Sequence, residues 1–207
     1  MTRLLLAFGL AAAALFAQTQ ESAGAPPSDV DPAIAGMVQK DGVRVKNGAK
    51  TLMELWFVTK APTDGNNGQD SVTFQNIAPG SFMGVMRFPE RGSDRRGQTI
   101  KPGAYTMRLG FYPQNGDHQG VAPQRDFLVL APISVDKDPK ATPAFEAMVD
   151  MSRKASGTPH PAVLSLWKVE QANFKPGIAQ EGEGDTVLQT KIGDLPAAVV
   201  VAGTAAH

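Results

Sequence analysis

Two of the three histidines and one aspartate lie in turns where they could bind a metal ion together. Asp117 and His118 are neighbours within residues 113–124 (PQNGDHQGVAPQ), and His160 lies in a Thr-Pro-His-Pro turn. Two imidazoles and one carboxylate suit a divalent ion, because each offers a lone pair in a fixed direction. If the fold brings the two turns together, we predict a metal site at these three residues. Otherwise the aspartate and its flanking glycines set the turn.

The same loop is bordered by residues that could bind another ligand. The loop over residues 113–124 is longer than a usual hairpin connection, which has about two to five residues. Tyr112 precedes the loop and is expected to face solvent, while Arg125 and Asp126 follow it and are expected to form a local ion pair. The candidate ligand-binding residues are therefore Tyr112, Asp117, His118, Arg125 and Asp126.

No pattern in the chain predicts catalysis. The sequence has no G-x-S-x-G motif, phosphate-binding loop or dinucleotide-binding fingerprint. It also has no cysteine, which excludes thiol catalysis and thiolate zinc sites. We interpret the chain as a non-catalytic binding or structural module. A metal-binding protein that uses Asp117, His118 and His160 is one alternative, and a carbohydrate or peptide binder that uses Tyr112 and residues 91–96 is another.

Charged residues are balanced in number but unevenly distributed. Lysine plus arginine and aspartate plus glutamate each number 20, and this balance does not favour nucleic acid as a partner. Basic residues gather between positions 87 and 108, and acidic residues gather between positions 170 and 194. Two solvated faces are the simplest interpretation of this segregation.

The N-terminal segment has the layout of a secretory signal peptide. Arg3 provides a positive start, residues 4–16 are apolar, and the small Ala17 precedes the polar Gln18. The apolar run is shorter than the roughly 20 residues of a membrane-spanning helix. We predict a signal peptide over residues 1–17 and no membrane span after its cleavage. The expected location is the periplasm or the extracellular space, with a protein or glycan of the cell envelope as partner.

The rest of the chain predicts an all-β domain. Residues 18–37 are polar and aperiodic and are expected to form a flexible leader before a single domain over residues 38–207. Thr142 and Pro143 are expected to begin one short helix that ends at Gly157. The predicted strands are 42–46, 51–59, 71–75, 80–88, 104–112, 125–133, 162–169, 185–192 and 195–202. Without βαβ alternation, this pattern predicts an antiparallel β-sandwich, immunoglobulin-like or transthyretin-like.

One long segment resembles a group of known proteins. Residues 97–130 (GQTIKPGAYTMRLGFYPQNGDHQGVAPQRDFLVL) place a P-G-x-Y strand before a G-D-H-x-G loop and an R-D-F-L strand. With TPHPAVLSLW at residues 158–167, this arrangement resembles uncharacterised exported bacterial β-sandwich proteins. The resemblance implies the sandwich fold and draws attention to the loop, and it implies no reaction type.

Overall fold

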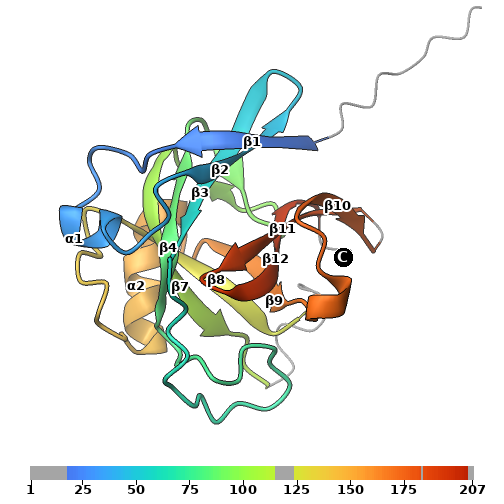
Figure 1. Cartoon of the computed structure of the whole chain (residues 1–207). Helices are drawn as coiled ribbons and strands as arrows, with labels where there is room; N and C mark the ends of the chain where they lie inside the picture. Colours follow the sequence, from blue (N-terminus) through green and yellow to red (C-terminus); the bar gives the residue numbers. More distant parts are fainter. Residues whose placement is uncertain (1–17, 115–123, 183, 205–207) are drawn as a thin grey trace, which may run out of the picture.

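The computed structural model describes residues 18–114, 124–182 and 184–204 (Figure 1). The helices of this described part are α1 (Pro32–Ala35), α2 (Phe145–Ser156) and the 3-10 helix η1 (Gln171–Asn173). Its strands are β1 (Gln18–Gly24), β2 (Gly42–Asn47), β3 (Lys50–Phe57), β4 (Phe82–Phe88), β5 (Gly92–Ser93), β6 (Thr99–Ile100), β7 (Gly103–Phe111), β8 (Asp126–Pro132), β9 (Val163–Lys168), β10 (Gly177–Glu181), β11 (Asp185–Ile192) and β12 (Leu195–Ala202).

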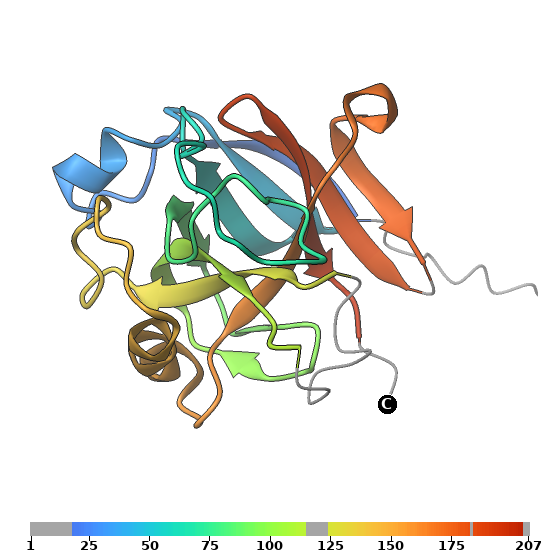
Figure 2. The ribbon, with the colours of Figure 1, turned by 90° about the horizontal axis from the view of Figure 1, so that it is seen from below.

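Ten strands of the described part form one antiparallel sheet in the order β1-β2-β3-β4-β7-β8-β9-β12-β11-β10. The sheet curls until its two edge strands, β1 and β10, come into contact (Figures 1 and 2). Near this seam, Gln18 Oε1 accepts a hydrogen bond from the Thr186 hydroxyl at 3.3 Å. The domain is therefore nearly a barrel. The prediction of an all-β antiparallel fold with one short packing helix is confirmed, whereas the sheet order does not confirm the sandwich type.

The chain before β2 has regular structure in place of the expected leader. β1 pairs with β2 from Gln18–Asn47 onward, and the Trp56 indole donates to the carbonyl of Gly24 at 2.7 Å. Asp31 caps the single-turn helix α1, and Val30 and Ile34 are buried in the main core. Strand pairing, the Trp56 hydrogen bond and the two buried apolar side chains hold the segment, although its overall composition is polar.

The strand predictions differ in their outcome. β2 and β3 form a hairpin closed by the pair Asn47–Lys50, and Gly48 in its two-residue loop adopts the positive φ of 58° that such turns favour. The predicted strand over residues 71–75 is wrong: Val72 and Phe74 are buried, but their backbone is irregular. β10 was not predicted, because its sequence GIAQE has only two apolar side chains.

Helix α2 packs on the outer surface of the barrel (Figure 1). It begins after Ala144, two residues later than the predicted start at Thr142 and Pro143. Its end is confirmed, because Gly157 caps it in the left-handed conformation with φ 72°. Met148 packs there with Tyr112, Phe127, Val129 and Val163.

A buried ion pair holds the segment that leads from β8 to α2. The Arg108 side chain, only 1% exposed, donates from Nε and Nη2 to the two oxygens of Asp136 at 2.6 and 2.8 Å. Its remaining donors reach the carbonyls of Gly80, Ala141 and Asp138 at 2.6–2.8 Å. The charge distribution predicted that Arg108 belongs to a solvated basic face. Because Arg108 is buried, this prediction is wrong.

No helix in the described ranges has the length and apolar character needed to span a membrane.

Candidate functional site

Tyr112 is a packing residue in this structure. It follows the end of β7, is 7% exposed, and stacks against Phe127 with ring centroids 4.4 Å apart. Burial raises the pKa of its hydroxyl above the ordinary value. The expectation that Tyr112 faces solvent is therefore wrong, and the exposed aromatic surface that a carbohydrate binder would need is not formed by this ring.

Arg125 and Asp126 both hold the segment before β4, and they form no ion pair with each other in the described part of the chain. The Asp126 carboxylate is buried and accepts from the backbone N–H of Thr73 at 2.9 Å and of Phe74 at 3.0 Å. Arg125 donates to the carbonyls of Tyr112 and Asp70. Burial raises the pKa of Asp126, and the hydrogen bonds from Thr73 and Phe74 partly oppose this shift. The expected local ion pair is therefore wrong.

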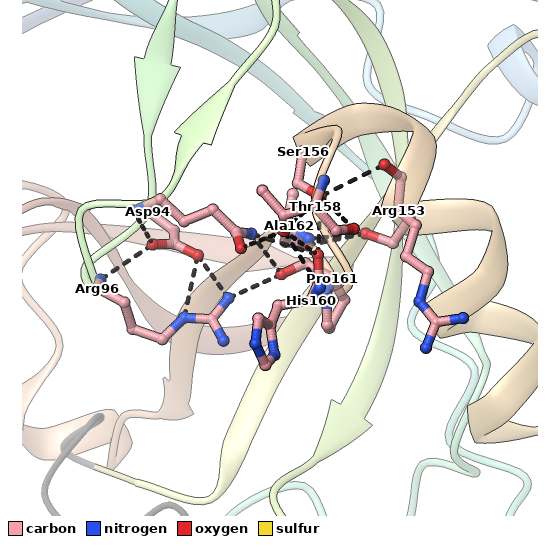
Figure 3. A network of polar contacts seen from close by, with 10 residues as sticks. Asp94, Arg96, Arg153, Ser156, Thr158, His160, Pro161 and Ala162 are labelled. Atoms are coloured by element: carbon pink, nitrogen blue, oxygen red, sulfur yellow. Dashed lines mark hydrogen bonds and ion pairs between the residues drawn. The ribbon is translucent and has the colours of Figure 1, made fainter.

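The predicted metal ligands are only partly described. Asp117 and His118 lie outside the described residues, whereas His160 is exposed in the turn before β9. Its imidazole points away from the polar network drawn in Figure 3. Within the described ranges, no three histidine, aspartate or glutamate side chains lie close enough to hold a metal ion. The metal site at Asp117, His118 and His160 therefore stays a prediction.

The network of Figure 3 fixes the β5–β6 hairpin against the turn that contains His160. The Asp94 side chain is fully buried and accepts from Arg96 Nη2 at 2.6 Å and from the backbone N–H of Gln98 at 3.0 Å. Arg96 and Gln98 then donate to the carbonyl of Pro161 at 2.7 and 2.9 Å. The hairpin is therefore anchored to the chain that enters β9.

A second ion pair anchors the same hairpin to β11. Arg95 Nε lies 2.9 Å from both carboxylate oxygens of Asp185, whose side chain is 8% exposed. Together, Asp94 and Asp185 neutralise Arg96 and Arg95. Residues 91–96, which the sequence singled out as a basic loop, thus owe their position to two buried carboxylates.

Beneath this hairpin lies a cavity of about 380 Å³, which we call the β9–β12 cavity. Its walls come from the start of β3, the end of β4, β5 and the residues after it, the start of β9, and the end of β12. Ligand pockets in proteins usually enclose about 300–1,000 Å³, so the cavity can hold a small molecule. Its lining residues are Lys50, Leu52, Met53, Phe88, Arg91, Gly92, Ser93, Asp94, Arg95, Leu164, Ser165, Val200, Val201, Ala202 and Gly203.

The cavity joins an apolar interior to a polar rim. Met53, Phe88, Leu164 and Val201 belong to the main hydrophobic core, and they form its apolar wall. Lys50, Arg91 and Ser93 are exposed and open it to solvent. Such a combination of apolar surface and a few polar groups is typical of small-molecule sites.

One polar side chain of the cavity is buried without a partner. Ser165 is 3% exposed, and its hydroxyl forms no hydrogen bond with any other described residue. Buried hydroxyl groups in proteins are nearly always hydrogen-bonded, either to protein or to a bound molecule. Ser165 therefore carries a buried hydroxyl with unmet hydrogen-bonding capacity among the described residues, on the face of β9 that it shares with Val163.

Comparison with protein families, with curated proteins and with solved structures found no match to this chain. The resemblance to exported bacterial β-sandwich proteins therefore stays a prediction.

No sequence pattern indicates the cavity, although residues 91–96 belong to one of the predicted binding alternatives. The remaining walls are apolar strand residues such as Leu164 and Val200, whose types are the same as those of core residues. Only the isolated serine in the run Val-Leu-Ser-Leu-Trp could have signalled that β9 borders something other than packed core.

Proposed function

We propose that the protein is a non-catalytic binding module that takes a small, largely apolar ligand into the β9–β12 cavity. The observation that carries this proposal is the cavity itself, with its apolar wall and its exposed basic rim. The signal peptide predicted over residues 1–17 supports a location in the periplasm or outside the cell. The proposal holds for a barrel and for the sandwich type alike, because only the strands around the cavity enter it.

The experiment is a fluorescence titration with N-phenylnaphthylamine, a neutral apolar probe that brightens when it leaves water. We expect saturable binding at one site per chain. The variant Ala202→Phe places a ring in the cavity, and we expect it to weaken probe binding at least about tenfold because the space is filled. Ala33→Phe, at an exposed position of α1, makes the same change away from the cavity.

Folding of each variant is checked by its thermal midpoint. If Ala202→Phe does not fold, Ser93→Trp on the exposed rim serves the same purpose. Probe binding that both cavity variants leave unchanged, or an absence of saturable binding, would show that the cavity is not a ligand site.

A further inference from the structure

The β9–β12 cavity lies at one end of the barrel. Its walls include the start of β3, the end of β4, the start of β9 and the end of β12. Because neighbouring strands of the sheet are antiparallel, these four strand ends lie at the same end of the barrel. Mouths of β-barrels are a frequent place for small-molecule sites. The cavity therefore has an inner end against the core and an outer end at the rim.

The inner end of the cavity is apolar. Its wall residues are each no more than 5% exposed, and they are Met53, Phe88, Leu164 and Val201. The buried charge that lines the cavity, Asp94, is paired with Arg96 at 2.6 Å. A hydrocarbon chain that enters from the rim leaves water against this wall, which favours binding about fourfold for each buried CH₂ group.

The outer end carries one positive charge without a matching negative charge. Of the three cations that line the cavity, Arg95 is paired with Asp185 at 2.9 Å. Lys50 is paired with Glu90 at 3.1 Å. Arg91 is exposed, and it has no hydrogen bond or ion pair with any other residue in the described ranges. A guanidinium binds a carboxylate through two parallel hydrogen bonds, so one carboxylate would balance the charge of the rim.

The unmatched charge and the apolar wall are carried by one short segment, residues 88–92. A Cβ atom at position 92 would overlap the ring of Phe88, so Gly92 allows the backbone beside Arg91 to contact that ring. Arg91 and Phe88 both line the cavity. A ligand that places its apolar part on Phe88 therefore has a cation at the outer end of the same wall.

We infer that the ligand of the β9–β12 cavity is a medium-chain carboxylate. This inference rests on the proposed function, whose ligand class it names. The hydrocarbon chain lies against Phe88, Leu164 and Val201, and the carboxylate stays at the solvent-exposed rim, on Arg91. The volume of about 380 Å³ is near the lower end of the range for ligand pockets, which favours a short chain over a long one.

The test is displacement of N-phenylnaphthylamine from the full chain, at neutral pH, by octanoate, octan-1-ol, octylammonium and butanoate. We expect octanoate to bind at least about tenfold more tightly than butanoate, because four more CH₂ groups leave water. We expect octylammonium to be the weakest of the three eight-carbon ligands, since its charge has the same sign as that of Arg91.

The variant Arg91→Gln assigns the charge effect to a residue. We expect its affinity for octanoate to fall about fivefold, the effect of one well-formed exposed ion pair. Its affinities for octan-1-ol and for the probe should stay within twofold of the wild type, which also shows that the variant is folded. Lys137→Gln removes an exposed cation that does not line the cavity, and it should change none of these affinities by more than twofold.

The variant Ala202→Phe assigns the chain of the ligand to the cavity, with Ser93→Trp in its place if it does not fold. We expect it to weaken octanoate and the probe alike, because both need the same space. Octanoate binding that survives while probe binding is lost would place the carboxylate elsewhere and overturn the inference.

The remaining outcomes separate this inference from the proposed function. Probe binding that octanoate does not displace would overturn the carboxylate ligand and leave the cavity as a site for neutral apolar molecules. The same conclusion would follow if Arg91→Gln left the affinity for octanoate unchanged, or if Lys137→Gln lowered it equally. An absence of saturable probe binding would refute the proposed function, and the inference with it.

Discussion

Two regions of the barrel wall contain buried polar groups: the cluster of Arg108 with Asp136, and Ser165 beside the β9–β12 cavity. They differ in whether the buried group has hydrogen-bond partners. Arg108 is enclosed, and five hydrogen bonds to Asp136 and to three carbonyls occupy its guanidinium. Ser165 is equally enclosed and has no hydrogen-bond partner among the described residues. The difference teaches that burial alone does not tell a satisfied polar group from an open one: its hydrogen-bond partners do.

The largest expected effect on stability comes from removing Arg108 from its hydrogen-bonded cluster with Asp136. Arg108→Met leaves the Asp136 carboxylate buried without its counter-charge, so we expect the free energy of unfolding to fall by about 3–5 kcal/mol. Urea denaturation followed by tryptophan fluorescence measures this change. Arg87→Met is the control, because Arg87 is 44% exposed and Glu54 keeps Arg44 as a partner. We expect that variant to lose no more than about 1 kcal/mol. Equal losses in the two variants would contradict the role given to the cluster.

Asp126 is an intermediate case, since it is buried with hydrogen bonds but without a counter-charge. Its pKa is raised above the ordinary value of 3.8 by burial, so the folded protein binds this proton more tightly than the unfolded chain does. The associated stability is complete below about pH 4 and is lost as the pH rises through the raised pKa.

We therefore expect the free energy of unfolding of the wild type, minus that of Asp126→Asn, to decrease as the pH rises above about 4. Denaturation curves at several pH values measure this difference, in which all other carboxylates cancel. The same difference for Asp194→Asn, at an exposed position, should stay flat. A difference that rises with pH for Asp126→Asn would mean that its hydrogen bonds outweigh its burial.

The smallest effect on stability is expected at Ser165. Ser165→Ala removes a hydroxyl that has no partner, so the free energy of unfolding should stay the same or increase by up to about 1 kcal/mol. Ser152→Ala is the matched change, because Ser152 is also buried but bonds to the N–H and C=O of Ala162 at 2.9 and 3.2 Å. It should cost about 1–3 kcal/mol. Equal costs at the two serines would contradict the contrast between satisfied and open polar groups.

The local elements of the fold could be predicted because local patterns specify them. Alternation in residues 104–112 predicts β7, and Gly157 predicts the end of α2. The wrong strand at residues 71–75 shows the limit of this reasoning: Val72 and Phe74 alternate, but the backbone of Thr73 is held by Asp126, which lies far away in the sequence. Alternation also looks the same in a sandwich and in a barrel, so it could not specify closure.

The candidate site could be predicted only at its rim. Residues 91–96 attract attention because they are basic, whereas the walls of the cavity consist of ordinary strand residues. The cavity lies beside the residues that follow the last pair of the β9–β12 ladder, Val199–Leu166. That ending depends on how two distant strands diverge in space, and no pattern within either strand encodes it.

The short β9–β12 ladder also has a consequence for the order in which the chain folds. On one side of it, β1 to β4 and β7 to β9 are neighbours in chain order, with β5 and β6 paired separately, and on the other side β10 to β12 form a second series of hairpins. Each series can form through contacts that are close in sequence, which is the faster kind of folding step. The two series become one domain where Ala197, Ala198 and Val199 meet β9. A ligand in the adjacent cavity would contact both series, so its binding would stabilise the association of the second series with the first.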